Sequence, residues 1–255
     1  ITNISSTIFI GTNFQSLWKS TNSGASWVSS NTGLPANAVV LSLISNGTNL
    51  YAGTTSSFYY STNSGASWIT PTNTGLPSTN IKSLLVVGAT VYAGTSNGLY
   101  KTTNNGSTWS LVSGGLPSIG FDALAVSGST IIAGTTTSGT NNYGIYKSTN
   151  NGTSWTQAIT GLTNTQVNAL FYNSTNLFVG TYGGVYLSTN NASNWTVKNN
   201  GLSFQNYVHD IYIDGSDIYL GTNFGGIFKS INDGVSWTEQ NTGINKAYVT
   251  SICRS

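Results

Sequence analysis

One eight-residue motif recurs six times along this 255-residue chain, and it constrains the fold more than any other feature of the sequence. Its pattern is Ser/Thr-x-Asn-x-Gly-x-Ser/Thr-Trp, and we name each copy a box. The boxes are Ser20–Trp27, Ser61–Trp68, Thr102–Trp109, Ser148–Trp155, Ser188–Trp195 and Ser230–Trp237. Their tryptophans are 41, 41, 46, 40 and 42 residues apart, and a period near 40 is typical of a β-propeller in which each repeat forms one blade.

Each box is predicted to be a tight turn between two strands. The Asn side chain can accept a hydrogen bond from the backbone two residues further on, and the Gly supplies the positive φ that such a turn needs. The Trp is then the first large apolar anchor of the following strand. An apolar-aromatic pair precedes every box, as expected for a β-strand. These pairs are Leu17-Trp18, Phe58-Tyr59, Leu99-Tyr100, Ile145-Tyr146, Val185-Tyr186 and Ile227-Phe228.

One repeat accommodates four short strands. After the loop at Gly33, apolar runs predict strands over Val40–Ile44, Leu50–Ala52 and Phe58–Tyr60, and a fourth strand opens at Trp68. The other first strands are predicted to begin at Ile81, Phe121, Val167 and Val208. We therefore expect one domain over residues 1–255, an all-β, six-bladed β-propeller of four-stranded antiparallel blades.

The two ends of the chain are predicted to belong to the same blade. Ile1–Ile4 falls where the second half of a first strand is expected, and Val249–Ile252 matches Ile81–Leu84 position for position. Pairing of the N- and C-terminal strands would close the ring and remove an open sheet edge. We expect the chain to be a segment of a longer run of such repeats.

The box resembles the Asp-box (BNR) repeat of sialidase-type β-propellers. The resemblance covers nearly the whole chain and implies the propeller fold, but this turn is used by enzymes and binding proteins alike. The chain departs from the pattern because Asn replaces Asp in every box, and the fifth box also has Ala192 for Gly and Asn194 for Ser/Thr. The Asn positions are Asn22, Asn63, Asn104, Asn150, Asn190 and Asn232.

The catalytic residues that the resemblance implies are missing. A sialidase would need an arginine cluster, a Tyr–Glu pair and an acid, whereas this chain has a single Arg, Arg254, and a single Glu, Glu239. A glycosidase needs two carboxylates at a defined separation, and Asp122 and Asp210 are the acids on predicted first strands. With one His and one Cys there is no metal-ligand cluster. We expect a protein that is not an enzyme and needs no cofactor or metal; a degenerate glycoside hydrolase remains an alternative.

Charge is the unusual part of the composition. Charged residues make up 5% of the chain, against about 25% in typical domains. A net charge of +2 provides no basic patch, so nucleic acid is not an expected partner. No apolar run is long enough for a membrane span. A neutral surface rich in hydroxyl and amide groups favours an extracellular protein, secreted or on the cell surface, which we expect to be a monomer.

Two sets of residues are candidates for a site. The first comprises aromatic residues in or beside the variable loops between second and third strands, where function is usually placed. Their rings beside Asn and Gln suit sugar rings; alternatively they pack the blades together. These residues are Phe14, Tyr143, Tyr182 and Phe224.

The second set lies at the second position of the first strands, where the repeats differ in chemistry. If first strands line the axis, these side chains lie at equivalent heights in different blades; alternatively they face water and vary freely. The set is Leu41, Lys82, Asp122, Asn168, His209 and Thr250, and its candidate binding residues are Lys82, Asp122, Asn168 and His209. The sequence thus predicts a non-catalytic secreted binding or interaction module, for carbohydrate or protein, and a structural spacer within a longer repeat protein remains an alternative.

Overall fold

The computed structural model describes residues 1–135, 143–174, 176–202, 207–244 and 248–252. The regular secondary structure in this part consists entirely of β-strands, and the strands within each sheet are antiparallel. Six sheets form the blades of an all-β, six-bladed propeller, which confirms the predicted fold class. Residues 136–142, in the variable loop that precedes Tyr143, and Arg254 lie outside the described residues.

The sheets fall into two compact units, which we describe separately. One comprises Ile1–Ser113 and Pro117–Phe121, and the other comprises Gly114–Leu116 and Asp122–Arg254. The prediction of a single domain over residues 1–255 stays a prediction. The strands of the first unit are, sheet by sheet, β1 (Thr2–Ile4), β2 (Thr7–Gly11), β3 (Leu17–Ser20) and β4 (Val28–Ser29); β5 (Val40–Asn46), β6 (Asn49–Thr54) and β7 (Phe58–Ser61); and β8 (Ile81–Val87), β9 (Thr90–Thr95), β10 (Gly98–Thr102) and β11 (Ser110–Leu111).

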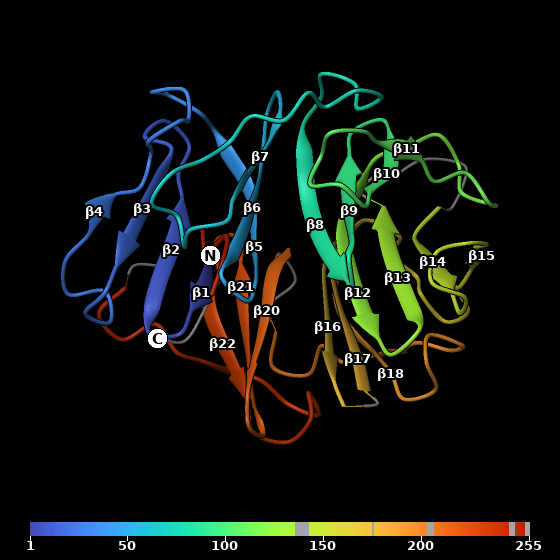
Figure 1. Cartoon of the computed structure of the whole chain (residues 1–255). Helices are drawn as coiled ribbons and strands as arrows, with labels where there is room; N and C mark the ends of the chain where they lie inside the picture. Colours follow the sequence, from blue (N-terminus) through green and yellow to red (C-terminus); the bar gives the residue numbers. More distant parts are fainter. Residues whose placement is uncertain (136–142, 175, 203–206, 245–247, 253–255) are drawn as a thin grey trace. The chain divides into compact units, whose positions relative to one another are not determined.

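The second unit repeats the same arrangement, and Figure 1 shows the strands β16, β17 and β18 of one of its sheets side by side. Its strands are β12 (Phe121–Ser127, whose first residue is assigned to the first unit), β13 (Thr130–Thr135), β14 (Ile145–Ser148) and β15 (Thr156–Gln157); β16 (Val167–Asn173), β17 (Asn176–Thr181), β18 (Gly184–Ser188) and β19 (Thr196–Val197); and β20 (Val208–Asp214), β21 (Asp217–Thr222), β22 (Gly226–Ser230) and β23 (Thr238–Glu239).

The first strands of five sheets begin at the predicted residues, while the fourth strands begin later than predicted. Each fourth strand has two residues and starts after the box Trp, not at it. In the second sheet it shrinks to a single bridge between Tyr60 and Ile69. The reason is that the backbone N–H of the Trp is used elsewhere: that of Trp68 donates to the carbonyl of Thr32 at 2.8 Å, and so it cannot join the ladder of its own sheet.

The predicted pairing of the two terminal segments is only partly tested. β1 pairs with β2 in the register Asn3↔Ile8, as expected for the second half of a first strand. Val249–Ile252 is assigned to no strand, so its pairing with the N-terminal strand stays a prediction.

Every box folds around the same hydrogen bonds. In the first box, Ser20 Oγ donates to Asn22 Oδ1 at 2.9 Å and accepts the N–H of Gly24 at 2.9 Å. Asn22 Oδ1 also accepts the N–H of Ser26 at 2.9 Å, four residues on and not two as predicted. The turn is wider than expected because two consecutive residues, Ser23 and Gly24, take positive φ values of 55° and 85°.

Box tryptophans in each unit connect neighbouring sheets, whereas the indole N–H of Trp155 donates to Gly152 in its own box. The indole N–H of Trp68 donates to the carbonyl of Ser30, and that of Trp195 donates to the carbonyl of Ala158, both at 2.8 Å. Trp68 and Trp195 are each 4% exposed, so these bonds satisfy polar atoms inside the core. The core therefore lies between sheets; in the second unit, one cluster joins Ile132 to Val167 and Trp195.

Candidate functional site

Four aromatic rings lie at the loop ends of two neighbouring sheets in the second unit. Tyr182 follows β17, Tyr207 precedes β20, and their ring centroids are 4.5 Å apart at an interplanar angle of 42°. Phe224 follows β21, Tyr248 lies further along the chain, and their centroids are 4.7 Å apart at 64°. We name these four residues the aromatic ridge. Tilted and edge-to-face pairs at such distances are favourable aromatic contacts.

The two ring pairs are connected through the backbone and follow the same repeat rule. The N–H of Asn223 donates to the carbonyl of Tyr207 at 2.9 Å, which places Tyr207 beside the loop that carries Phe224. In each pair, the ring after a second strand packs on the ring that stands just before a first-strand position, Val208 or Val249. The same two positions of the repeat therefore carry a pair of contacting aromatic rings in two consecutive repeats.

The ridge presents apolar surface to solvent. Tyr182, Phe224 and Tyr248 are 39%, 56% and 57% exposed. Phe224 has a φ of 61°, which is unfavourable for a bulky side chain and costs of order 1 kcal/mol. Strained backbone at an exposed ring is a feature that clusters at ligand sites.

Two polar atoms behind the ridge are buried without a hydrogen-bond partner, Asn223 Oδ1 and His209 Nε2. The His209 ring lies 6.3 Å from that of Tyr248. Burial lowers the pKa of His209, and the neighbouring Asp210 carboxylate opposes that shift. His209 is therefore predominantly neutral at neutral pH, and the ridge carries no charge from this residue.

The predicted aromatic residues are distributed over both units. Tyr182 and Phe224 belong to the ridge, and Tyr143 lies in the second unit, where its carbonyl accepts a hydrogen bond from Gln157 Nε2 at 2.8 Å. Phe14 belongs to the first unit and is 75% exposed in the loop between β2 and β3. The structure therefore brings together two of the four.

The predicted first-strand residues occupy β-bulges. The register shifts at the second position of four first strands, so that Leu41, Lys82, Asn168 and His209 are each the extra residue of a bulge. A bulge interrupts the alternation of side chains along a strand. The relative directions of His209 and Asp210 therefore do not follow from the simple alternation of a regular strand.

The predicted first-strand residues are divided between the two units. Lys82 belongs to the first unit, whereas Asp122, Asn168 and His209 belong to the second. Asn168 Nδ2 donates to the carbonyl of Val208 at 3.1 Å and so ties β16 to the neighbouring sheet. Asp122 is half-buried on β12. His209 lies beside the ridge, with its ring 6.3 Å from that of Tyr248.

Asp210, the second acid of the glycosidase alternative, is occupied by backbone groups. Its Oδ1 accepts the N–H of Ile211 at 2.9 Å, and its Oδ2 accepts the N–H of Ile252 at 2.7 Å. Burial raises the pKa of the Asp210 carboxyl, while the hydrogen bonds from Ile252, Ser251 and Ile211 oppose that rise. Both carboxyl oxygens of Asp210 therefore accept backbone N–H groups and hold the local structure.

Sequence reasoning missed Tyr207, Tyr248 and Asn223. A signal for the two tyrosines was present, because each stands directly before an apolar residue at the first-strand position of consecutive repeats. That their rings meet Tyr182 and Phe224 depends on packing between sheets, which no local pattern specifies.

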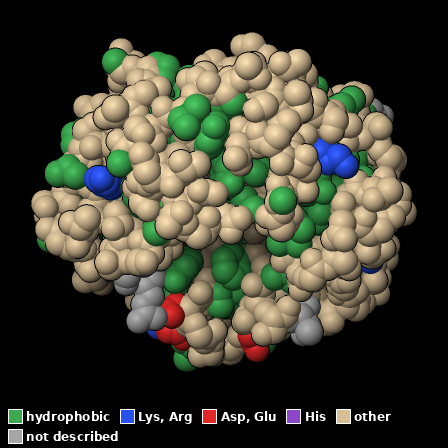
Figure 2. Space-filling model, viewed as in Figure 1, with side chains coloured by type: hydrophobic (Ala, Val, Ile, Leu, Met, Phe, Trp, Pro, Cys, Tyr) green, Lys and Arg blue, Asp and Glu red, His purple; other side chains and the backbone are tan. Residues whose placement is uncertain are grey.

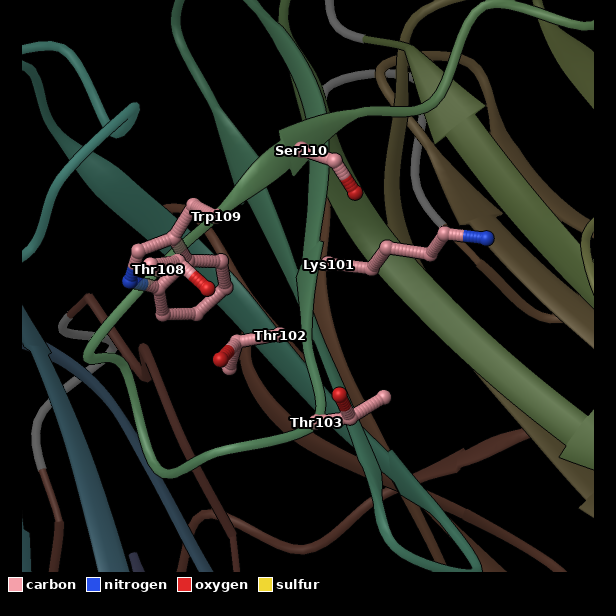
Figure 3. A pocket seen from close by; sticks show the side chains of 6 residues that line it. All are labelled: Lys101, Thr102, Thr103, Thr108, Trp109 and Ser110. Carbon is pink, nitrogen blue, oxygen red and sulfur yellow. The ribbon is translucent and has the colours of Figure 1, made fainter.

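A separate pocket of about 240 Å³ lies beside the third box (Figure 3). Its lining includes Lys101, whose side chain extends away from the Trp109 ring. Thr102 Oγ1 donates to Asn104 Oδ1, and Thr108 Oγ1 accepts from Asn104 Nδ2, both at 2.9 Å. These hydroxyls already serve the box turn, so the pocket belongs to the hairpin and not to the ridge.

The surface is mostly uncharged. Figure 2 shows a face in which uncharged polar side chains and backbone predominate, with few basic or acidic groups. Within the described ranges, no three residues of the types His, Cys, Asp and Glu gather closely enough to hold a metal ion. In the same part of the chain, no helix is long and apolar enough to cross a membrane.

Comparison with known proteins supports the propeller fold. The family model described as DUF6242 beta propeller domain matches residues 5–188. No curated protein matches the chain. Among solved structures, the extracellular domain of BT4673 from B. thetaiotaomicron is similar with a TM-score of 0.77 at 20% identity, over 96% of this chain and 34% of that one. The chain therefore spans about a third of the length of that extracellular domain.

Two other similar structures have different described roles. YCF48 bound to D1 peptide has a TM-score of 0.68 at 16% identity, covering 89% of this chain and 75% of that one. The GH74 xyloglucanase from Xanthomonas campestris has a TM-score of 0.63 at 14% identity, covering 91% and 50%. At these identities the likeness shows the fold alone, which hosts both an enzyme and a peptide-binding protein.

Proposed function

Starting from the fact that the chain belongs to the DUF6242 beta propeller domain family, we propose that it is a non-catalytic, extracellular module that binds neutral carbohydrate through the aromatic ridge. The observation that carries the proposal is the ridge itself: paired rings on two consecutive sheets, with three of the four rings exposed. Sugar rings have apolar faces that pack on aromatic rings and hydroxyl edges that bond to amides.

The polar surroundings of the ridge fit a neutral ligand. Asn223, whose Oδ1 has no hydrogen-bond partner, directly precedes Phe224. Amides recognise hydroxyl groups without requiring charge. A protein with 5% charged residues has little means of recognising an ionic partner, so a neutral glycan suits it better than a charged peptide.

The absence of catalysis is part of the proposal. Asp210 is the acid nearest the ridge in sequence, and both of its oxygens accept backbone N–H groups. A general acid must be free to give its proton to the leaving group, and a nucleophile must be free to attack. The box turns are then Asp-box-type turns with a structural task. The extracellular location is supported by the similarity to the BT4673 extracellular domain.

Binding to neutral polysaccharides tests the proposal. We expect the folded protein to be retarded in native gels that contain soluble xyloglucan, glucomannan or mixed-linkage glucan. Tyr182→Ala and Phe224→Ala should each lower the affinity by about 5- to 30-fold, equivalent to about 1–2 kcal/mol for an exposed aromatic anchor. Ile231→Ala is the matched control, because Ile231 is 72% exposed on the box turn of the sheet that carries Phe224.

The outcomes separate the alternatives. Retardation lost in both ridge variants and kept in the control supports the proposal. Retardation that persists in both ridge variants places the site elsewhere. Binding to a panel of peptides without any binding to glycans would support an interaction module for protein, and cleavage of a glycan that stops in Asp210→Asn would support the glycosidase alternative.

A further inference from the structure

The segment Tyr248–Ile252 brings the fourth ring to the ridge without being part of a strand. Val249 lies against Gly221, where a Cβ added to the glycine would be 2.8 Å from Val249 Cγ1. The same relation holds between Gly180 and Val208 at 2.5 Å. Val249 therefore occupies the place that the first residue of the following first strand occupies elsewhere.

Two hydrogen bonds hold this segment to its neighbouring sheet. The N–H of Val249 donates to the carbonyl of Thr222 at 3.1 Å, just as the N–H of Val40 donates to that of Thr12 in the first unit. The N–H of Ile252 donates to Asp210 Oδ2 at 2.7 Å, a short bond to a buried carboxyl group. Charge-assisted bonds of this length are about twice as strong as neutral ones.

The acid is specific to this sheet. At the third position of the first strand, Ser42 and Ser83 donate to the carbonyl of the next first strand, namely that of Ile81 at 2.9 Å and Phe121 at 3.3 Å. Ala123 and Ala169 stand at this position in two other sheets. Asp210 alone among these positions can accept backbone N–H groups with two oxygens, and it does so next to the bulge residue His209.

We propose that Asp210 is a positioning residue for the ridge: it holds Tyr248–Ile252 against β20 and β21, and thereby sets Tyr248 against Phe224 as the second half of the binding surface. This rests on the proposed function. The Tyr182–Tyr207 pair stands on segments whose ends are fixed by strands, whereas the Phe224–Tyr248 pair depends on this docked segment. Ligands that span both pairs need the Asp210 contact, and ligands that occupy the Tyr182–Tyr207 pair alone can do without it.

The test combines a structural measurement with a binding measurement. We expect Asp210→Asn to raise amide hydrogen exchange in a peptide covering Tyr248–Ile252 by at least about tenfold, with no change in β16–β18. Ile252→Pro removes the donor N–H and leaves Asp210 intact, so it should act in the same way. Asp217→Asn is the control, because it makes the same chemical change on β21, where Asp217 pairs with Lys229 at 2.7 Å.

Binding then distinguishes positioning from mere stability. With a long xyloglucan, Asp210→Asn should weaken binding as much as Tyr248→Ala, and the double variant should be no weaker than either single variant. With the heptasaccharide repeat of the same polymer, Asp210→Asn should lose clearly less affinity than with the polymer. Equal losses for both ligands, or additive effects in the double variant, would overturn the proposal.

Failure of this inference can be told from failure of the proposed function. If the unmodified protein binds no glycan, the proposed function falls and the positioning role for a glycan site falls with it, while the exchange data still report whether Asp210 holds the segment. If glycan binding depends on Tyr182 and Phe224 but exchange at Tyr248–Ile252 is unchanged in both Asp210→Asn and Ile252→Pro, only the positioning role is overturned.

Discussion

A side-chain amide at the third position of each box makes hydrogen bonds that a carboxylate could not. Asn22 Oδ1 accepts from Ser20 Oγ and from the N–H of Ser26, while Asn22 Nδ2 donates to Ser26 Oγ at 2.8 Å. The fifth box lacks this last hydroxyl because it carries Asn194, yet it keeps the bond from the N–H of Asn194 to Asn190 Oδ1. The turn therefore depends on the hydrogen bonds that the amide oxygen accepts, and the bond that the amide nitrogen donates contributes less.

His209 makes stability depend on pH near neutrality, and it is the single histidine of the chain. Its pKa in the folded protein lies below the ordinary value of 6.5, chiefly because of burial. The unfolded chain therefore binds protons more readily, so the contribution of His209 to stability is present above pH 6.5 and is lost as the pH falls through the lowered pKa.

We expect the contribution of His209 to lower the free energy of unfolding between about pH 7.5 and about pH 5, so that over this range the unmodified protein loses stability relative to His209→Gln. Urea titrations at steps across this range measure both curves. Asp210 acts in the opposite direction, because its raised pKa contributes stability at low pH that is lost as the pH rises above 3.8. Parallel curves for the two proteins would show that His209 titrates alike in the folded and unfolded states.

At the scale of strands and sheets, glycines govern how closely neighbouring sheets approach. Gly33 has a φ of 92°, and a Cβ on it would collide with the carbonyl oxygen of Trp68 on the next sheet. Gly47 in the hairpin between β5 and β6 also has a positive φ, 61°, but a Cβ there would meet nothing within 4 Å. The two positions separate the effect of backbone conformation from that of contact between sheets.

We predict that Gly33→Ala destabilises the protein by about 1–3 kcal/mol more than Gly47→Ala. Both variants place a Cβ at positive φ, which costs about 1–2 kcal/mol, but only Gly33→Ala also forces two sheets apart, with a typical overpacking cost of about 1–3 kcal/mol. Midpoints and slopes of urea unfolding give the comparison. Equal losses of stability in the two variants would mean that the Trp68 backbone moves away from the added Cβ at no cost in free energy.

At the scale of the whole chain, electrostatics contribute little. The chain has 8 basic and 6 acidic side chains in 255 residues. One of its ion pairs, Lys229–Asp217, has side chains that are 26% and 31% exposed, and such partly solvated pairs contribute little to stability. Stability therefore rests on the cores between sheets and on the polar bonds of the boxes.

Ionic strength should consequently have little effect on folding. We expect the free energy of unfolding at neutral pH to change by less than about 0.5 kcal/mol between about 0.05 M and about 0.5 M NaCl, because few surface charges are available to be screened. Thermal or urea unfolding at the two salt concentrations tests this. A larger loss of stability in salt would point to ion pairs that contribute more than their exposure indicates.

The sequence alone determined the six boxes and the strand starts at Val40, Ile81 and Val208. It thereby determined the propeller. Each box closes through bonds among eight consecutive residues, and each strand follows from a local apolar run, so short-range chemistry was sufficient. The tertiary structure decided which side chains of the loops come into contact. Tyr182 meets Tyr207, and Phe224 meets Tyr248, across the junction between sheets. Bulges redirect the first-strand residues, and Asp210 gains its partner only when a distant segment docks beside it. Those contacts depend on how neighbouring repeats pack, which the pattern of a single repeat does not encode.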